Sequence, residues 1–170
     1  NRSKAYRAKG MLKEAARDAA LAEKYALLEK LQAFRIQFKL KEAKQTGDEA
    51  VKQLPESSYA NLLGGVSALN FASYREAFDR FSKVISKHPD CSFAYYFRAD
   101  AARGLKKFAQ AQSDYDKILS LKPRYVAMSY TAATGKSAGS KTQIDCQPVL
   151  LSDIYFLKGL AYEQAGDLVK

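Results

Sequence analysis

An internal repeat is the feature of this sequence that most constrains its fold. The segment that begins at Ser58 can be laid over the segment that begins at Ser92, so that Pro89 falls on Pro123. Residues of the same type then coincide, in the pairs Tyr74 with Phe108, Ala77 with Ala111, Phe81 with Tyr115 and Val84 with Ile118. A period of this length, about 34 residues, predicts a stack of small helical units, which typically presents a binding groove and not a catalytic pocket.

Each repeat has the pattern of two helices joined by a short turn. We expect helices over residues 59–71 and 74–87 in the first repeat, and over residues 93–105 and 108–121 in the second. Pro89 and Pro123 would end the second helices, because proline lacks a backbone N–H and collides with the preceding helical turn. The pattern returns over residues 152–170, where Tyr155, Gly159 and Tyr162 take the places of Tyr95, Ala99 and Ala102.

Small and large side chains alternate at fixed places in the expected helices. The small ones are Gly65, Ala77, Ala99, Ala111 and Gly159, and the large ones are Phe81, Tyr95, Tyr115 and Tyr155. Only small side chains let two helix axes approach closely, and large neighbours then fill the remaining space. In this pattern residues 58–123 and 152–170 resemble the tetratricopeptide repeat (TPR) family. The resemblance implies an all-α fold, a right-handed solenoid of helical hairpins whose first helices line a concave face.

The chain divides into four parts on this interpretation. Residues 1–54 form a basic helical extension, 58–125 two TPR units, 126–151 a Ser/Thr/Gly-rich insertion expected to be a loop, and 152–170 the first helix of a third unit. Within the extension, residues 4–44 are rich in good helix formers, and Thr46-Gly47-Asp48 is expected to break the helix. Pro55 precedes Pro89 by the same spacing that separates Pro89 from Pro123, so a degenerate repeat is the alternative, although Gly47 then replaces an aromatic residue.

The resemblance to the TPR family also implies which residues face the groove. They come from the first helices of the three units, and they are Tyr59, Leu62, Leu63, Val66, Phe93, Tyr96, Phe97, Asp100, Arg103, Phe156, Leu157 and Leu160. This set is strongly apolar and aromatic, which favours binding of an amphipathic helix or an apolar extended segment. The alternative is that an apolar stripe of the N-terminal extension, which includes Leu27, Leu31, Phe34 and Phe38, covers part of it.

One branch of the TPR family binds the C-terminal carboxylate of the major chaperones through Lys, Asn and Arg in the groove. The matching positions here are Leu62, Val66 and Phe97. Because these side chains carry no charge or amide group, we expect no capture of a chaperone tail.

Positive charge is concentrated in the N-terminal part of the chain. Of the net charge of +10, residues 1–44 contribute 12 Lys/Arg against 5 Asp/Glu, or +7. The basic surface expected there comprises Arg2, Lys4, Arg7, Lys9, Lys13 and Arg17. Such a surface either binds nucleic acid, acidic protein or anionic lipid, or is a solvated helix face. Association with nucleic acid, in a ribonucleoprotein or chromatin complex, is therefore the alternative function.

Residues with catalytic or metal-binding patterns are few. His88 is the single histidine, Cys91 and Cys146 are too far apart in sequence for a metal motif, and Gly135-Lys136-Ser137 lacks the glycine of a phosphate-binding loop. We therefore expect no enzyme, no catalytic residue, no metal and no cofactor.

The apolar runs are short and the first ten residues are charged, so we expect neither a membrane span nor a signal peptide. The cysteine usage is typical of an intracellular protein, cytoplasmic or nuclear. Together these observations predict a non-catalytic scaffold or adaptor for protein–protein interaction within a larger assembly.

Overall fold

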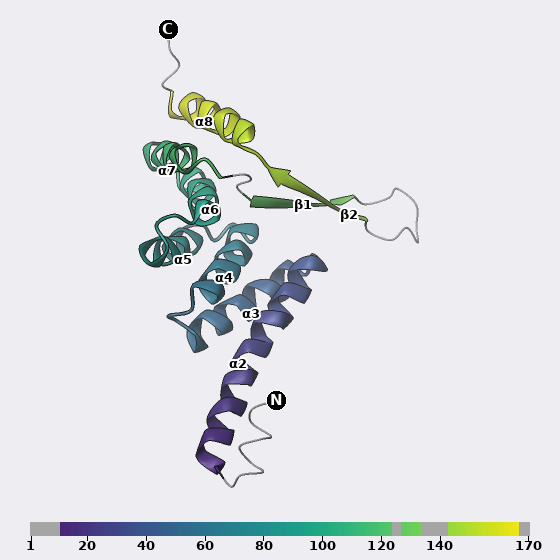
Figure 1. Ribbon diagram of the computed structural model, residues 1–170. Coiled ribbons are helices and arrows are strands. Elements are labelled where there is room, and N and C mark those ends of the chain that lie inside the picture. Colours follow the sequence, from purple (N-terminus) through teal and green to yellow (C-terminus); the bar gives the residue numbers. More distant parts are fainter. Residues whose placement is uncertain (1–10, 124–126, 134–142, 167–170) are drawn as a thin grey trace.

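The computed structural model describes residues 11–123, 127–133 and 143–166 of the chain (Figure 1). The helices are α2 (Leu12–Ile36), α3 (Leu40–Gln53), α4 (Ser58–Asn70), α5 (Tyr74–Lys87), α6 (Ser92–Gly104), α7 (Phe108–Leu121) and α8 (Leu151–Ala165). Two strands, β1 (Ala127–Ala133) and β2 (Gln143–Val149), lie between α7 and α8. The helices of the two repeats begin and end within one residue of the bounds expected from the sequence.

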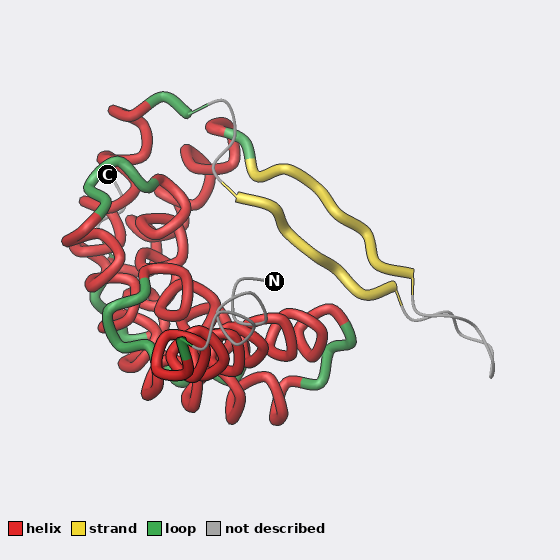
Figure 2. Tube along the Cα trace, turned by 60° about the horizontal axis from the view of Figure 1, so that its bottom comes forward, coloured by secondary structure: helices red, strands yellow, loops and turns green. Residues whose placement is uncertain are grey.

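Consecutive helices pack against each other from α2 to α7, and α8 packs against α7. The result is a right-handed solenoid of helical hairpins, in which α2 and α3, α4 and α5, and α6 and α7 are paired. Figure 2 shows that the helices follow an arc and that the two strands lie across from it. Three apolar clusters run through the stack and share residues of neighbouring hairpins.

The repeat extends into the N-terminal segment, because the turn between its two helices has the same backbone conformation as the turns of the two clear repeats. Phe38, Ala72 and Lys106 are each one repeat length apart, and their φ angles are 55°, 58° and 58°. After each, the next residue donates its N–H to the carbonyl five residues back, at 2.9, 2.8 and 2.8 Å. This pattern closes a helix with a left-handed residue, which costs about 1 kcal/mol without glycine. Residues 12–53 thus form a hairpin with the same turn as the two clear repeats.

Two expectations for the N-terminal segment were therefore wrong. The helix expected over residues 4–44 ends at Ile36, and the expected break at Thr46-Gly47-Asp48 lies inside α3. Gly47 is glycine because α3 and α4 cross there. A Cβ on Gly47 would lie 3.2 Å from the Cα of Gly64, which is shorter than an ordinary carbon contact. The glycine that seemed to mark a turn instead allows two helices to touch.

The insertion contains secondary structure that the sequence did not suggest. β1 and β2 pair antiparallel, from Ala127 opposite Val149 to Ala133 opposite Gln143. The expectation of a plain loop was wrong for these two segments. Both strands are edges, so Pro148 can occupy β2 without removing a hydrogen bond from a third strand. The sheet is an addition to the helical solenoid and leaves its helix order unchanged.

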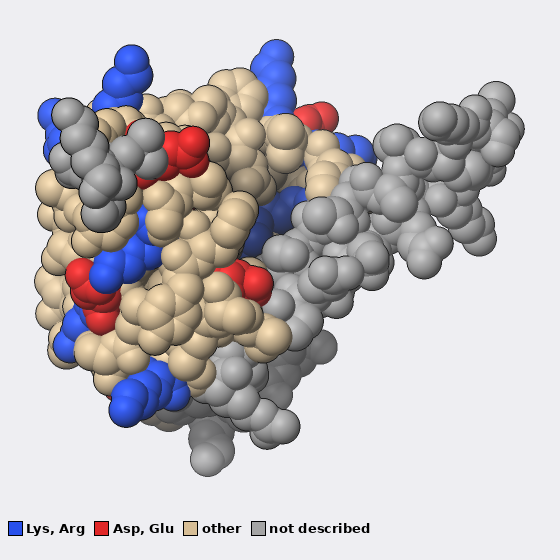
Figure 3. Space-filling view, turned by 90° about the horizontal axis from the view of Figure 1, so that it is seen from above, with Lys and Arg blue, Asp and Glu red and all other residues tan. Residues whose placement is uncertain are grey.

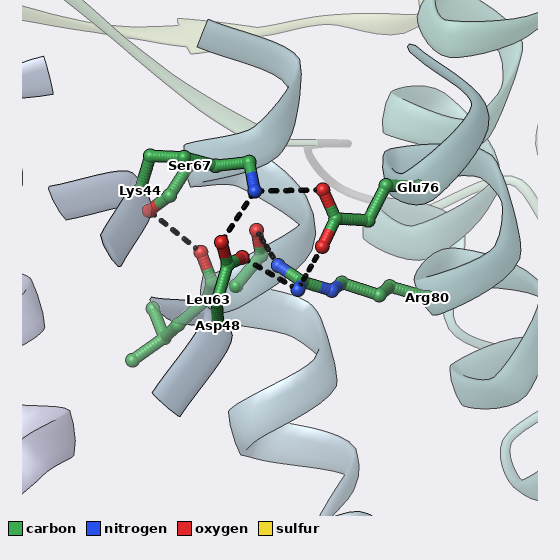
Figure 4. Close-up of polar contacts among 7 residues, drawn as sticks. Lys44, Asp48, Leu63, Ser67, Glu76 and Arg80 are labelled. Carbon is green, nitrogen blue, oxygen red and sulfur yellow. Dashed lines mark hydrogen bonds and ion pairs between the residues drawn. The ribbon is translucent and has the colours of Figure 1, made fainter. Parts of the chain in front are cut away.

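A cluster of charged side chains joins α3, α4 and α5 (Figure 4). The Nη2 of Arg80 contacts Asp48 at 2.7 Å and also Glu76, and its Nη1 donates to the carbonyl of Gly64 at 2.8 Å. Lys44 Nζ contacts Asp48 at 2.6 Å and Glu76 at 2.7 Å. Because Arg80 is buried, each of its partners is needed to offset the loss of water.

The pKa values of Asp48 and Lys44 are shifted in the directions that stabilise their charged forms. Burial raises the pKa of Asp48, but Lys44 and Arg80 outweigh it and hold it below its ordinary value of 3.8. Burial lowers the pKa of Lys44, but hydrogen bonds to Asp48 and Glu76 outweigh it and raise it. The lowered pKa of Asp48 means that its contribution to stability is present above pH 3.8 and is lost as the pH falls through the folded-state pKa.

We predict that Arg80→Met destabilises the protein by about 2–4 kcal/mol, because two carboxylates and a carbonyl lose their donor. The loss should shrink as the pH falls from 3.8 through the lower folded-state pKa of Asp48, where that carboxylate becomes protonated. Urea unfolding at neutral and acidic pH measures both effects. Lys83→Met, at an exposed site on the same helix, serves as the control and should change stability by less than about 0.5 kcal/mol.

A second prediction concerns the crossing of α3 and α4. A Cβ on Gly64 would lie 2.8 Å from Val51 Cγ2 and 3.2 Å from the carbonyl oxygen of Gly47. Gly64→Ala should therefore destabilise the protein by about 1–3 kcal/mol. Gly159→Ala, where nothing lies within 4 Å of the added Cβ, should instead stabilise by up to about 1 kcal/mol. Thermal unfolding of both variants checks this, and equal effects would contradict the assigned crossing.

Candidate functional site

The first helices of the hairpins lie on the inner side of the arc. α2 contacts α4 and α4 contacts α6, whereas contacts among α3, α5 and α7 are fewer. In a curved stack the helices on the inner side must lie closer together, so α2, α4, α6 and α8 line the concave face. We call the side chains that α4, α6 and α8 present there the inner face.

The centre of the inner face is an aromatic cluster on α6. The ring of Phe97 lies 4.7 Å from that of Phe93 and 5.0 Å from that of Tyr96, measured between centroids. On its other side Phe97 stacks on Phe81 of α5, at 5.7 Å. All three α6 rings are half-buried. They are thus held in place by packing while each keeps part of its surface exposed, which suits an aromatic anchor for a ligand.

The structure places the twelve predicted groove residues at different depths. Leu63 and Val66 are 3% and 4% exposed and pack inside the apolar clusters, so they support the helices and offer no surface to a ligand. Tyr59 and Phe156 are 48% and 68% exposed. The others are exposed or half-buried, and they are Leu62, Phe93, Tyr96, Phe97, Asp100, Arg103, Leu157 and Leu160.

Asp153 is a further residue of this region, and it was not among the twelve predicted groove residues. It occupies the repeat position of Tyr59 and Phe93, so the same register could have found it. Its carboxylate accepts a hydrogen bond from the backbone N–H of Leu150 at 2.7 Å and caps the start of α8. Burial raises the pKa of Tyr96, and the charges of Asp100 and Asp153 raise it further. The start of α8 and the middle of α6 thus share one electrostatic environment.

Asp100 of α6 is a carboxyl group on the inner face, in the same helix as the aromatic cluster. Burial raises the pKa of Asp100, and Arg103 offsets this only in part because the two side chains are 4.0 Å apart. The Asp100 side chain is nevertheless 51% exposed. A group that water reaches while protein surrounds it is typical of a concave surface. Arg103 also donates from Nε to Gln164 of α8 at 3.2 Å, which links α6 and α8.

The inner face is supported from behind by a second buried ion pair. Arg98 of α6 binds Asp114 of α7 through Nε at 2.8 Å and Nη2 at 2.6 Å, and Gln110 donates to the same carboxylate. The guanidinium also lies over the rings of Phe78 and Tyr95, at 5.6 and 5.5 Å. Behind it, burial raises the pKa of Tyr115 to about 12. These contacts fix the rotation of α6 about its axis and so the direction of its aromatic cluster.

The N-terminal helix does not cover the aromatic cluster in the part of the chain that the structure describes. Leu28 and Leu31 of α2 pack with Ala43, Ala50 and Leu63 of α3 and α4. The apolar stripe of α2 thus packs on Leu63 of the predicted groove set, on α4, one hairpin away from α6. Phe38 lies in the turn after α2 and is 36% exposed.

The basic surface expected at the N-terminus is described only in part. Arg2, Lys4, Arg7 and Lys9 lie outside the described residues, and Lys13 and Arg17 are exposed on α2. On the face drawn in Figure 3, Lys and Arg occur in separate small groups, several of them beside Asp or Glu. The charge on that face is therefore mixed, and no basic stripe crosses it.

The described residues hold neither a metal-binding arrangement nor a transmembrane helix. Their His, Cys, Asp and Glu side chains form no group of three that could bind a metal ion. None of the described helices has the length and apolar content needed to cross a bilayer.

A hollow of about 650 Å³ lies between α3, α5 and the end of α6, lined by Val51, Tyr74, Arg75, Asp79 and Leu105 among others. His88 is exposed and lies 2.9 Å from Ser58 Oγ.

Solved structures with this arrangement are TPR domains. The crystal structure of MamA has a TM-score of 0.65 and 18% identity, over 96% of this chain and 79% of that chain. MamA residues 41 to the end from Desulfovibrio magneticus RS-1 gives a TM-score of 0.57 and 22% identity, over 72% of each chain. The first TPR domain of Spaghetti (RPAP3), bound to an HSP90 peptide, gives 0.54 and 21%, over 59% of this chain and 79% of that chain.

This likeness identifies the fold: the chain is a TPR solenoid of helical hairpins. At 18–22% identity the likeness shows the fold alone, so the activity of this chain has to be inferred from its own residues. No family model matches the sequence, and no curated protein matches it.

We predict that Asp100→Asn stabilises the protein at about pH 7. The folded-state pKa of Asp100 is above its ordinary value of 3.8, so the folded protein binds more protons than the unfolded chain between these two values. Stability therefore falls as the pH rises through that range, and Asn removes the loss. The gain in melting temperature should diminish towards pH 3.8 and below. Asp79→Asn, at an exposed carboxyl on α5, is the control and should give no comparable gain.

Proposed function

We propose that this protein is a non-catalytic scaffold that binds an apolar or amphipathic peptide segment on its inner face. The observation that carries the proposal is the aromatic cluster of Phe93, Tyr96 and Phe97, which is rigidly supported and yet partly exposed. Exposed Phe156 on α8 and Tyr59 on α4 extend the aromatic surface to the neighbouring helices. An exposed surface of this composition is usually a contact surface.

The residues at the positions that bind a carboxylate in chaperone-binding TPR domains favour an apolar ligand over an acidic tail. The positions that correspond to the carboxylate-binding residues of chaperone-binding TPR domains carry Leu62, Val66 and Phe97. Val66 is buried and Phe97 belongs to the aromatic cluster, so neither position offers a donor to a carboxylate. The RPAP3 TPR domain in the comparison is bound to the HSP90 peptide SRMEEVD. This chain shares that fold, and we infer that it takes a different class of peptide.

The geometry of the ligand follows from the distribution of the aromatic residues over three helices. Aromatic residues come from three first helices, with Tyr59 on α4, the cluster on α6 and Phe156 on α8, so a ligand that contacts all three must offer several apolar side chains along its length. An amphipathic helix, with apolar residues three or four apart, satisfies this requirement, as does an extended apolar segment. Asp100 and Arg103 follow the cluster on the same helix, where they would orient the polar side of the ligand.

Selection of peptides from a random display library against the full chain tests the proposal. We expect selected peptides to carry aromatic or large aliphatic anchors and to bind at least about tenfold more weakly to a Tyr96→Ala, Phe156→Ser variant, since each lost anchor removes about 1–3 kcal/mol. Phe97 is left intact because it packs on Phe81 and its loss would disturb the fold. Circular dichroism verifies that the variant keeps its helices.

The matched control is Phe71→Ser. Phe71 follows α4, is 50% exposed and lies outside the predicted groove set, so its removal should leave binding unchanged. The synthetic peptide SRMEEVD, titrated in parallel, should not bind. Selected peptides that bind equally to the folded double variant, or saturable binding of SRMEEVD, would contradict the proposal.

A further inference from the structure

The charged residues of the inner face are mainly acidic, although the chain as a whole has a net charge of +10. The helix α4 holds no charged residue. Arg98 of α6 and Lys158 of α8 bind carboxylates of α7, behind the inner face. The remaining charged residues of α6 and α8 are Asp100, Arg103, Asp153 and Glu163. Three of these four are carboxylates.

The register of the repeat places Asp153 and Glu163 on the inner face. Asp153 occupies the repeat position of Phe93, and Glu163 occupies that of Arg103, and both positions belong to the predicted groove set. The charge of Asp153 acts on the middle of α6. Burial raises the pKa of Tyr96, and the charges of Asp100 and Asp153 raise it further and outweigh Arg103, which lowers it. The potential at the aromatic cluster is therefore negative.

The carboxylate of Asp100 has no close cation. Arg103 is 4.0 Å away, and no other described residue forms an ion pair or a hydrogen bond with this carboxylate. The guanidinium of Arg103 donates to Gln164 instead, at 3.2 Å. Burial raises the pKa of Asp100, so its charge destabilises the unliganded protein at neutral pH. A cation brought by a ligand would offset this cost, and the side chain is 51% exposed and therefore accessible to one.

The opposite side of α6 shows how this chain binds a cation. There the guanidinium of Arg98 contacts the carboxylate of Asp114 and lies over the rings of Phe78 and Tyr95, at 5.6 and 5.5 Å from their centroids. The carboxylate attracts the cation by its charge, and the rings attract it because their faces are electron-rich. The inner side of α6 offers the same two kinds of group, since Asp100 directly follows the aromatic cluster by one helical turn.

We propose that the inner face selects a basic amphipathic peptide, with lysine or arginine beside its apolar anchors. One cation of the peptide pairs with Asp100 and lies against Tyr96. Asp153 and Glu163 attract further cations towards α8. The inference rests on the peptide-binding function proposed above and names the class of peptide that this function serves.

The charge of peptides selected from a random display library against the full chain tests this inference. We expect Lys and Arg to exceed Asp and Glu by at least about threefold, relative to the unselected library. The sign of the preference is informative because the chain is basic. Non-specific attraction to a protein of net charge +10 would select acidic peptides, so a basic preference has to come from the local field of the inner face.

A double variant, Asp100→Asn with Glu163→Gln, locates the preference. It removes two of the three carboxylates with little change of shape, and Asp153 is left intact because it caps α8. Selection against this variant should show no excess of Lys and Arg. By fluorescence anisotropy, a basic peptide selected against the parent should bind the variant at least about fivefold more weakly. Replacing the lysines and arginines of that peptide with glutamine should weaken its binding to the parent and leave its binding to the variant unchanged.

The matched control is Asp79→Asn with Asp90→Asn. Both carboxylates are exposed, one on α5 and the other in the turn that follows it, so the net charge changes equally while the inner face keeps its residues. This control should bind the basic peptide as the parent does. Circular dichroism verifies that both double variants keep their helices.

The outcomes separate this inference from the proposed function. Selected peptides that need Tyr96 and Phe156, but carry no excess of Lys and Arg or bind the Asp100→Asn, Glu163→Gln variant as well as the parent, would overturn the inference and leave the function in place. An excess of Asp and Glu would overturn it as well. If no selected peptide needs Tyr96 and Phe156, the proposed function fails and the inference fails with it.

Discussion

The close approach of neighbouring helices is the constraint on which the rest of the structure depends. Gly65 lies under the ring of Phe81, and Gly47 lies against Gly64, at distances that leave no room for a Cβ without rearrangement. These contacts set the spacing of the helices and therefore the curvature of the stack. The inner face and its aromatic cluster follow from that curvature, because it brings the first helices side by side.

Buried charge sets the rotation of the helices that the small residues bring together. Arg80 joins α5 to α3 and α4, and Arg98 joins α6 to α7 and α5. The two arginines do not occupy the same repeat position: Arg80 corresponds to Asp114, and Arg98 corresponds to Gly64. The buried arginine is thus on the second helix of the hairpin in one unit and on the first helix in the other. Because a buried arginine is costly without partners, either arrangement excludes other rotations of its helices.

The same physical reasoning applies to the inner face, which we propose as the binding surface. At the inner face, packing on Phe81 holds Phe97 and its neighbours ready for a ligand, so little conformational entropy is lost when one binds.

The sequence by itself determined the period, the helices of the two clear repeats and the list of residues on their first helices. Helix propensity and the spacing of small and large residues are local, so they can be read from one chain. The tertiary structure decided the rest. It placed Gly47 inside a helix, because a glycine at a helix crossing and a glycine at a turn look alike in sequence. It buried Leu63 and Val66 while leaving Phe156 exposed, because burial depends on which helices are present to cover each face.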